Sequence, residues 1–243
     1  MPQSRQNDRF RLLNWLGGHE LGILVLLLAV TAGVWIFATL ANDVREGETN
    51  SFDRRILLSL RHADLTPLGP PSVQEAVRDV SALGSDSLLG LATLIVAGFL
   101  VLDGKSRMAV FAAVSVIGGG ILSTLLKDFF QRPRPEIVPH LAYAANTSFP
   151  SGHSMMSALT YLTLAALLAR SQERRRIKAY FLLLAVLIAF LVGVSRIYLG
   201  VHWPTDVLAG WTAGTTWALI CWLIARSLQR RKALEPEAQR EGR

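Results

Sequence analysis

The chain has 243 residues, of which 51% are hydrophobic and 18% charged, and its formal net charge at pH 7 is +7. A positive charge of this size suggests nucleic acid, but the basic residues cluster beside long apolar blocks, which is typical of membrane proteins instead. The single cysteine, Cys221, excludes an intramolecular disulfide, and no ligand cluster accompanies it that would predict a zinc site.

Six apolar segments are each long enough to cross a bilayer, which takes about 20 helical residues. We expect them at residues 21–42, 87–102, 108–126, 154–169, 179–195 and 207–225. The predicted fold class is therefore all-α, a polytopic membrane protein with six transmembrane helices in a bundle. The first apolar run exceeds the apolar region of about 7–15 residues in a signal peptide, so we expect it to remain as a transmembrane helix.

The distribution of lysine and arginine predicts the orientation. More of these residues fall on the segments that face the cytoplasm if both termini lie inside, which is the usual bias. We therefore expect a cytoplasmic N-terminus (1–20), a six-helix membrane domain (21–226) and a charged cytoplasmic tail (227–243) that frays.

The outer segment 42–82 is predicted to carry short helices. Four apolar residues between Phe52 and Leu60 recur at helical spacing among charged residues, which favours an amphipathic helix on the membrane surface. A second short helix is expected at 73–83, and the prolines and glycine at 67–71 predict a turn between the two.

Three polar clusters stand at helix ends on the predicted outer face. They occupy residues 127–135 after the third span, 150–153 at the start of the fourth, and 195–206 between the fifth and sixth. Ionisable residues at a membrane border are costly to place and are therefore functional candidates. A topology inferred from charge bias alone brings all three clusters to one side, so we expect them to form one site.

The cations in these clusters indicate a phosphoryl group as the substrate. Lys127, Arg134 and Arg196 would supply three positive charges, and fixed cations stabilise the charge on the equatorial oxygens of a phosphoryl group in its transition state. Ser151 is a natural N-cap for the fourth span, although a serine here could also bind phosphate or act as a nucleophile. Gly152 would let backbone N–H groups approach an anion at the helix N-terminus.

Two histidines complete the predicted chemistry. His202 and Asp206 are four residues apart, so a helix that starts near Pro204 lets the carboxylate reach one ring nitrogen and leaves the other as a nucleophile. His153 would then protonate the leaving group and activate water to cleave the phosphohistidine. A lone histidine or arginine at a membrane border is usually an interfacial anchor, so the prediction depends on the whole set.

These clusters resemble the three-part signature of the type 2 phosphatidic acid phosphatase superfamily, K-x6-R-P, P-S-G-H and S-R-x5-H-x3-D. Every signature position is matched, by Lys127 with Arg134-Pro135, by Pro150-Ser151-Gly152-His153, and by Ser195-Arg196 with His202 and Asp206. The resemblance implies a lipid phosphatase or diphosphatase that needs neither a metal nor a cofactor. It also implies that His202 is the nucleophile, Asp206 its orienting partner and His153 the general acid. The phosphate would be held by Lys127, Arg134, Ser151, Gly152 and Arg196.

Bacterial members of this size resemble phosphatases of undecaprenyl diphosphate, phosphatidylglycerol phosphate or phosphatidate, and we rank the prenyl diphosphate first from the resemblance alone. The expected protein is integral to the plasma (inner) membrane, with its active site on the periplasmic or extracellular side. Its expected partners are a lipid phosphate substrate and membrane lipids, with no nucleic acid, and the sequence does not predict an oligomeric state.

Three other functions fit parts of the pattern. A lipid-linked phosphotransferase would use the same site with an acceptor other than water. A vanadate-dependent haloperoxidase has a similar site, but such enzymes resemble soluble helical proteins. A transporter would be expected to place its ionisable groups near the bilayer midplane, whereas here they stand at helix ends.

Overall fold

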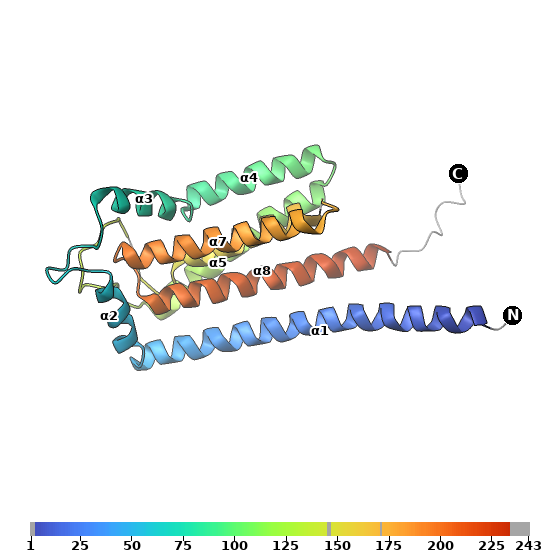
Figure 1. Ribbon diagram of the computed structural model, residues 1–243, viewed down its shortest axis with the longest axis horizontal. Helices are drawn as coiled ribbons and strands as arrows, with labels where there is room; N and C mark the ends of the chain where they lie inside the picture. The colour runs from blue at the N-terminus through green and yellow to red at the C-terminus, as the bar shows by residue number, and fades with distance from the viewer. Residues whose placement is uncertain (1–2, 145–146, 171, 234–243) are drawn as a thin grey trace.

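The computed structural model describes residues 3–144, 147–170 and 172–233, and its secondary structure there is helical apart from one isolated bridge between Arg61 and Pro67. The six longest helices run side by side, and α2 and α3 lie at one end of the bundle, called here the α2/α3 end (Figure 1). The helices are α1 (Gln3–Glu46), α2 (Asn50–Ser59), α3 (Pro71–Ala82), α4 (Asp86–Leu102), α5 (Ser106–Phe130), α6 (Gly152–Arg170), α7 (Arg175–Tyr198) and α8 (Pro204–Ala233).

The predicted six-span bundle is confirmed. Within the described residues five helices are long and apolar enough to cross a membrane, and a sixth span results if α3 and α4, which meet at an angle of 50°, are taken together. α4 coincides with the predicted second span and α3 with the predicted second short helix. The chain is thus an integral membrane protein built from α-helices.

The two ends of the chain are more helical than expected. α1 starts at Gln3 and passes without a break into the first span. α8 continues to Ala233, so the expectation that the tail frays directly after Arg226 is wrong for residues 227–233. Residues 1–2 and 234–243 lie outside the described residues.

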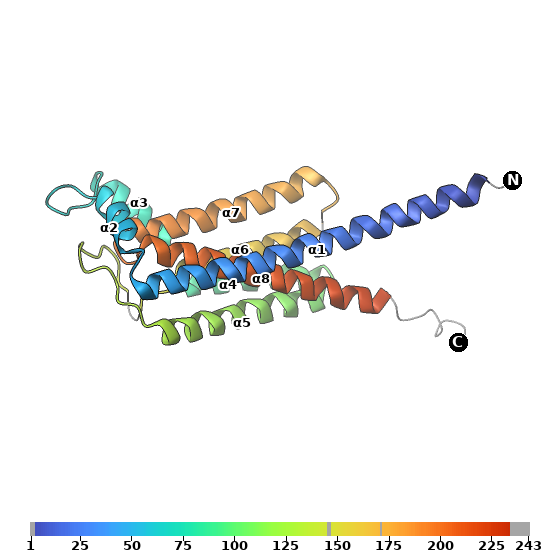
Figure 2. The ribbon, with the colours of Figure 1, turned by 90° about the horizontal axis from the view of Figure 1, so that it is seen from below.

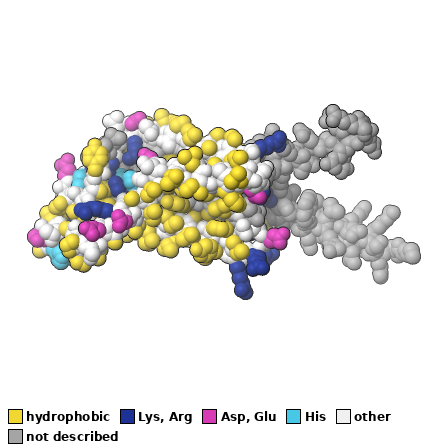
Figure 3. Space-filling view, turned by 90° about the horizontal axis from the view of Figure 1, so that it is seen from above, with side chains coloured by type: hydrophobic (Ala, Val, Ile, Leu, Met, Phe, Trp, Pro, Cys, Tyr) yellow, Lys and Arg dark blue, Asp and Glu magenta, His cyan; other side chains and the backbone are white. Residues whose placement is uncertain are grey.

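α6 is the central helix, and 67% of its residues from Gly152 to Ala169 are buried. It packs against α4, α5, α7 and α8 (Figure 2). Close approach depends on small residues, as expected where lipid replaces water around the helices. A Cβ added to Gly119 of α5 would lie 2.1 Å from a methyl carbon of Leu159 in α6. Large apolar side chains instead face outward and make the middle of the molecule apolar (Figure 3).

α6 and α8 meet backbone to backbone. A Cβ added to Gly214 would lie 2.3 Å from the carbonyl oxygen of Met155, and one added to Gly210 would lie 2.7 Å from that of Ser151. The two glycines of the sixth span therefore allow the close approach of the two helices. The contact fixes the first turns of both helices, where the polar clusters begin.

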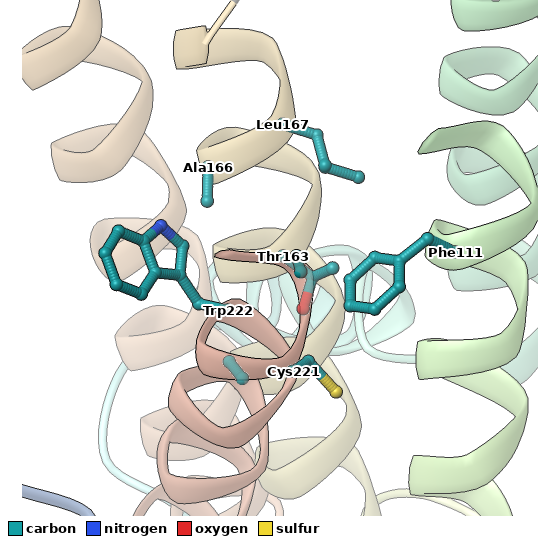
Figure 4. Close-up of a pocket in the computed structure, with 8 residues that line it drawn as sticks. Phe111, Thr163, Ala166, Leu167, Cys221 and Trp222 are labelled. Atoms are coloured by element: carbon teal, nitrogen blue, oxygen red, sulfur yellow. The ribbon is translucent and has the colours of Figure 1, made fainter. Parts of the chain in front are cut away.

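A small cavity of about 20 Å³, room for about one water molecule, lies between α5, α6 and α8 (Figure 4). It is lined by Phe111, Thr163, Ala166, Leu167, Ala218, Cys221, Trp222 and Ala225. Cys221 is buried there as a free thiol, as expected of a small apolar residue inside the bundle.

α2 differs from its prediction in which side chains face inward. Leu57 is fully buried, but so is Asp53, with 1% of its surface exposed, whereas Phe52 is 45% exposed. The inner face of this amphipathic helix therefore carries a carboxylate. Its partner is Arg132, whose Nη2 donates to Asp53 Oδ2 at 2.8 Å.

Candidate active site

The three predicted clusters converge at the α2/α3 end, where histidine, lysine and arginine side chains gather (Figure 3). A cavity of about 520 Å³ opens among them. It is lined by Asp86, Gly120, Ser123, Thr124, Lys127, Arg134, Tyr143, Ala144, Gly152, His153, Met156, Arg196 and His202. Of the predicted site residues, only Ser151 and Asp206 do not line the cavity, and both are fully buried.

Lys127 and Arg134 reach the cavity from the end of α5 and the segment after it. The helix ends at Phe130, and the next residue, Gln131, has a left-handed φ of 46° that turns the chain away from the helix. Lys127 Nζ donates to the carbonyl of Thr147 at 3.3 Å, and Arg134 Nη1 donates to that of Val201 at 2.6 Å. Both cations are thus held in place by backbone carbonyls beside the cavity.

Arg134 also contacts His202. Its Nη1 lies 3.2 Å from Nε2 of the imidazole. Because a guanidinium is only a donor, Nε2 accepts, and the ring proton lies on Nδ1. Burial lowers the pKa of His202 well below its ordinary value, and the positive charges of Arg134, Arg196 and Lys127 lower it further. The ring is therefore neutral at pH 7, with a lone pair on the nitrogen that faces the cations.

Asp206 lies on the other side of the same ring. Its Oδ2 is 3.4 Å from His202 Nδ1, which makes no hydrogen bond with the described residues, so the contact is electrostatic rather than a well-formed hydrogen bond. The carboxylate is held from two directions. Trp203 N–H donates to Oδ2 at 2.9 Å, and Arg132 Nη1 donates to Oδ1 at 2.6 Å.

The start of α6 supplies the Ser-Gly-His cluster. Ser151 Oγ accepts a long hydrogen bond from Ser154 N–H at 3.4 Å, as predicted for an N-cap. A Cβ added to Gly152 would lie 3.2 Å from Lys127 Cε, so the glycine leaves room for the lysine chain. The backbone N–H of Ser151 donates to the carbonyl of Asp206 at 3.0 Å, which joins the first turns of α6 and α8.

Arg196 forms the remaining wall from the last turn of α7. Its side chain is buried, and Nη1 donates to Ser81 Oγ of α3 at 2.8 Å. Its Nε is buried without a hydrogen-bond partner among the described residues. Buried donors are normally paired, so this N–H is an exception among the buried polar groups of the site.

This geometry agrees with the comparisons with known proteins. The family model described as the PAP2 superfamily matches residues 108–230, about half of the chain and the part that holds all three clusters. The chain belongs to the PAP2 superfamily.

Individual relatives agree with this membership. Phosphatidylglycerophosphatase B of Bacillus subtilis (strain 168) is 37% identical over 150 residues, 59% of this chain and 71% of that protein. An undecaprenyl-diphosphatase of Sulfolobus acidocaldarius is 28% identical over 126 residues, 50% of this chain and 57% of that protein.

A solved structure extends the likeness to the fold. The crystal structure of a transmembrane PAP2-type phosphatidylglycerolphosphate phosphatase from Bacillus subtilis matches with a TM-score of 0.76 and 27% identity, over 83% of this chain and 98% of that one. The predicted family and activity class, a membrane lipid phosphatase, are thereby confirmed.

Beside the PAP2 signature, the structure places charged and polar residues that sequence reasoning missed. Arg132 donates to Asp206 and also to Asp53, and Ser81 accepts from Arg196. Arg132 was detectable, because it stands inside the first cluster between two signature positions. Asp53 gave a weaker signal, a lone acid at helical spacing within an apolar stripe, and Ser81 gave none.

Proposed function

We propose that this PAP2 phosphatase hydrolyses a phosphate monoester or diphosphate of a membrane lipid, without a metal, through a phosphohistidine formed on His202. The observation that carries the proposal is the setting of the imidazole. Arg134 Nη1 lies 3.2 Å from Nε2 of His202, and Asp206 Oδ2 lies 3.4 Å from its Nδ1. The ring is neutral because it is buried among cations. A neutral imidazole with its lone pair on the cavity side is what nucleophilic attack requires.

In the first step, Nε2 attacks phosphorus while the bond to the leaving oxygen breaks. The lipid leaves as an alkoxide, or as a lipid phosphate if the substrate is a diphosphate, and His153 gives it a proton. The imidazole then carries a positive charge, which Asp206 stabilises across Nδ1. In the second step, His153 removes a proton from water, which attacks phosphorus, breaks the P–N bond and releases inorganic phosphate.

Three cations bind the phosphoryl oxygens in both steps. Lys127, Arg134 and Arg196 line one cavity, and arginine matches phosphate through planar, paired donors. Arg134 must leave Nε2 when phosphate binds, because the same guanidinium would then bond to a phosphoryl oxygen.

The relatives support the proposed substrate class. Their names, and the apolar surface that adjoins the cavity, support a phosphate at the membrane interface. We propose phosphatidylglycerol phosphate, undecaprenyl diphosphate or phosphatidate, presented at the periplasmic or extracellular face. A competition assay of the purified enzyme against these three lipids, read as relative kcat/KM, identifies the preferred one.

The test of the mechanism is phosphate release from the preferred lipid in detergent micelles by the wild type, His202→Asn and His62→Asn. His62 is exposed and does not line the cavity, and serves as the matched control. We expect His202→Asn to lose activity and His62→Asn to keep it. Rapid quench in alkaline SDS, with a lipid labelled in the transferred phosphate, should leave on the wild type a label that is stable to alkali and released by acid, and no label on His202→Asn. Turnover by His202→Asn would contradict the nucleophile.

Metal independence and the transition state are tested with the same preparation. We expect EDTA to leave the rate unchanged, because side-chain cations supply the positive charge. Vanadate should inhibit, because its five-coordinate form resembles the phosphoryl transition state. Activity that EDTA abolishes and Mg²⁺ restores would contradict the mechanism.

A further inference from the structure

A second carboxylate stands behind the site, on the helix whose inner face was expected to be apolar. Asp53 of α2 is 1% exposed and makes three contacts. Its Oδ1 accepts from Thr205 N–H at 2.9 Å, and its Oδ2 accepts from Thr205 Oγ1 at 2.7 Å and from Arg132 Nη2 at 2.8 Å. Asp53 therefore binds both the first turn of α8 and the arginine that holds Asp206.

Arg132 joins the two carboxylates. Its Nη2 donates to Asp53, while its Nη1 donates to Asp206 Oδ1 at 2.6 Å and to Thr205 Oγ1 at 2.9 Å. The guanidinium also lies over the ring of Trp203, 5.5 Å from its centroid. A planar fork with donors on two nitrogens can hold two carboxylates in one fixed arrangement, which an ammonium group cannot do.

We propose that Asp53 and Arg132 are positioning residues for the phosphatase reaction: Asp53 fixes Arg132, and Arg132 holds Asp206 Oδ1 so that Oδ2 faces His202. The proposal rests on the proposed function, in which His202 is the nucleophile. It gives the segment between α1 and α3 a role in the reaction, since α2 supplies the far end of the chain of contacts. Neither side chain lines the cavity, so neither contacts the substrate.

The charges support an orienting role. Two carboxylates and one guanidinium leave this buried cluster with one net negative charge, beside a ring that gains a positive charge when phosphorus is attacked. Loss of Asp53 would leave Arg132 paired with Asp206 alone, and loss of Arg132 would leave two buried carboxylates unpaired and repelling each other. Either change moves or neutralises the carboxylate that faces Nδ1.

Steady-state kinetics of folded enzyme test this proposal, with Asp53→Asn, Arg132→Gln and Arg132→Lys. We expect Asp53→Asn to lower kcat about 10–100-fold, the range for partners that orient a reacting group, and to leave KM within about twofold. Arg132→Gln should lower kcat at least as much. Arg132→Lys should recover only part of the loss, because it restores the charge but not the fork.

The double variant separates positioning from independent structural effects. If Asp53 acts through Arg132, Asp53→Asn adds little further loss of kcat in an Arg132→Gln background. Asp79→Asn and Arg54→Gln, at exposed positions of α3 and α2, are the matched controls and should keep wild-type kcat and KM. A purely structural role would lower the yield of folded protein and leave kcat per folded molecule unchanged.

Wild-type kcat in folded Asp53→Asn, or losses in the two single variants that multiply in the double variant, would overturn the proposal. If Asp53→Asn does not fold, the two single variants Asp53→Glu and Arg132→Lys take its place. Wild-type kcat in both of these variants would equally overturn the proposal. His202→Asn in the same assay keeps the two proposals apart. If it is active, the nucleophile is wrong; if it is inactive while Asp53→Asn turns over normally, only the positioning role is wrong.

Discussion

Asp206 Oδ2 lies 3.4 Å from Nδ1 of His202, with the carboxylate fully buried and 2% of the imidazole side chain exposed. The two groups are thus close to each other, yet they do not form a tight hydrogen bond in the free enzyme. The attraction becomes strong when the ring turns positive, which in the proposed mechanism happens as phosphorus is attacked.

Asp206→Asn should therefore fold but turn over slowly. The amide keeps an oxygen for Trp203 N–H or Arg132 but loses the charge that stabilises the imidazolium. We expect kcat to fall by about 100-fold or more, in the range of general acid–base effects. Asp103→Asn, at an exposed ion pair near the opposite end of α4, is the control, and a near-normal rate for Asp206→Asn would exclude the orienting role.

The low pKa of His202 predicts how stability depends on pH. In the unfolded chain the imidazole takes up a proton below about pH 6.5, whereas the buried ring does not. The unfolded state then binds more protons, so stability falls as the pH drops below about 6.5, by up to about 1.4 kcal/mol per pH unit. Thermal unfolding in detergent between pH 5 and 8 should show a steeper acid-side loss for the wild type than for His202→Gln, and parallel curves would contradict this.

Gly214→Ala should damage both stability and activity. The added Cβ would lie 2.3 Å from the carbonyl oxygen of Met155, so α8 must move away from α6. We expect a loss of about 1–3 kcal/mol, typical of overpacking, together with reduced kcat. Gly98→Ala in α4, where a Cβ meets nothing within 4 Å, is the control and should be as stable as the wild type. Equal melting temperatures for the two variants would contradict the backbone contact.

Cysteine labelling tests the proposed orientation. Tyr143 is 92% exposed at the cavity end, and Arg174 is exposed between α6 and α7 at the other end. In a Cys221→Ala background, a membrane-impermeant maleimide should label Tyr143→Cys in intact cells, and Arg174→Cys only after permeabilisation. The reverse pattern would place the site on the cytoplasmic side.

The spans and the site residues could be predicted because their signals are local. Long apolar runs give the helices, and the signature spacing gave Lys127, Arg134, His153 and His202, which the structure brings to one cavity. The preference of Pro204 for a first turn likewise predicted the start of α8.

The supporting residues could not be predicted because their partners are far away in the sequence. Asp53 stands at helical spacing within the apolar stripe of α2, but its burial depends on Arg132 and Thr205, which reach it from other segments. Ser81 meets Arg196 only through the packing of α3 on α7. The contact of Arg134 with Nε2 also depends on the path of the chain after Gln131.

The backbone contact between α6 and α8 divides the cavity wall into a fixed part and an adjustable part. The hydrogen bond from Ser151 N–H to the Asp206 carbonyl joins the first turns of the two helices. Gly210 and Gly214 pack there against the backbone of α6, which leaves no space for larger residues. The part of the cavity wall formed by Thr124 of α5 and Tyr143 consists of exposed side chains. Redesign for a different lipid headgroup should therefore begin with substitutions on that part of the wall. Such substitutions can reshape the cavity while His202 and Asp206 keep their positions.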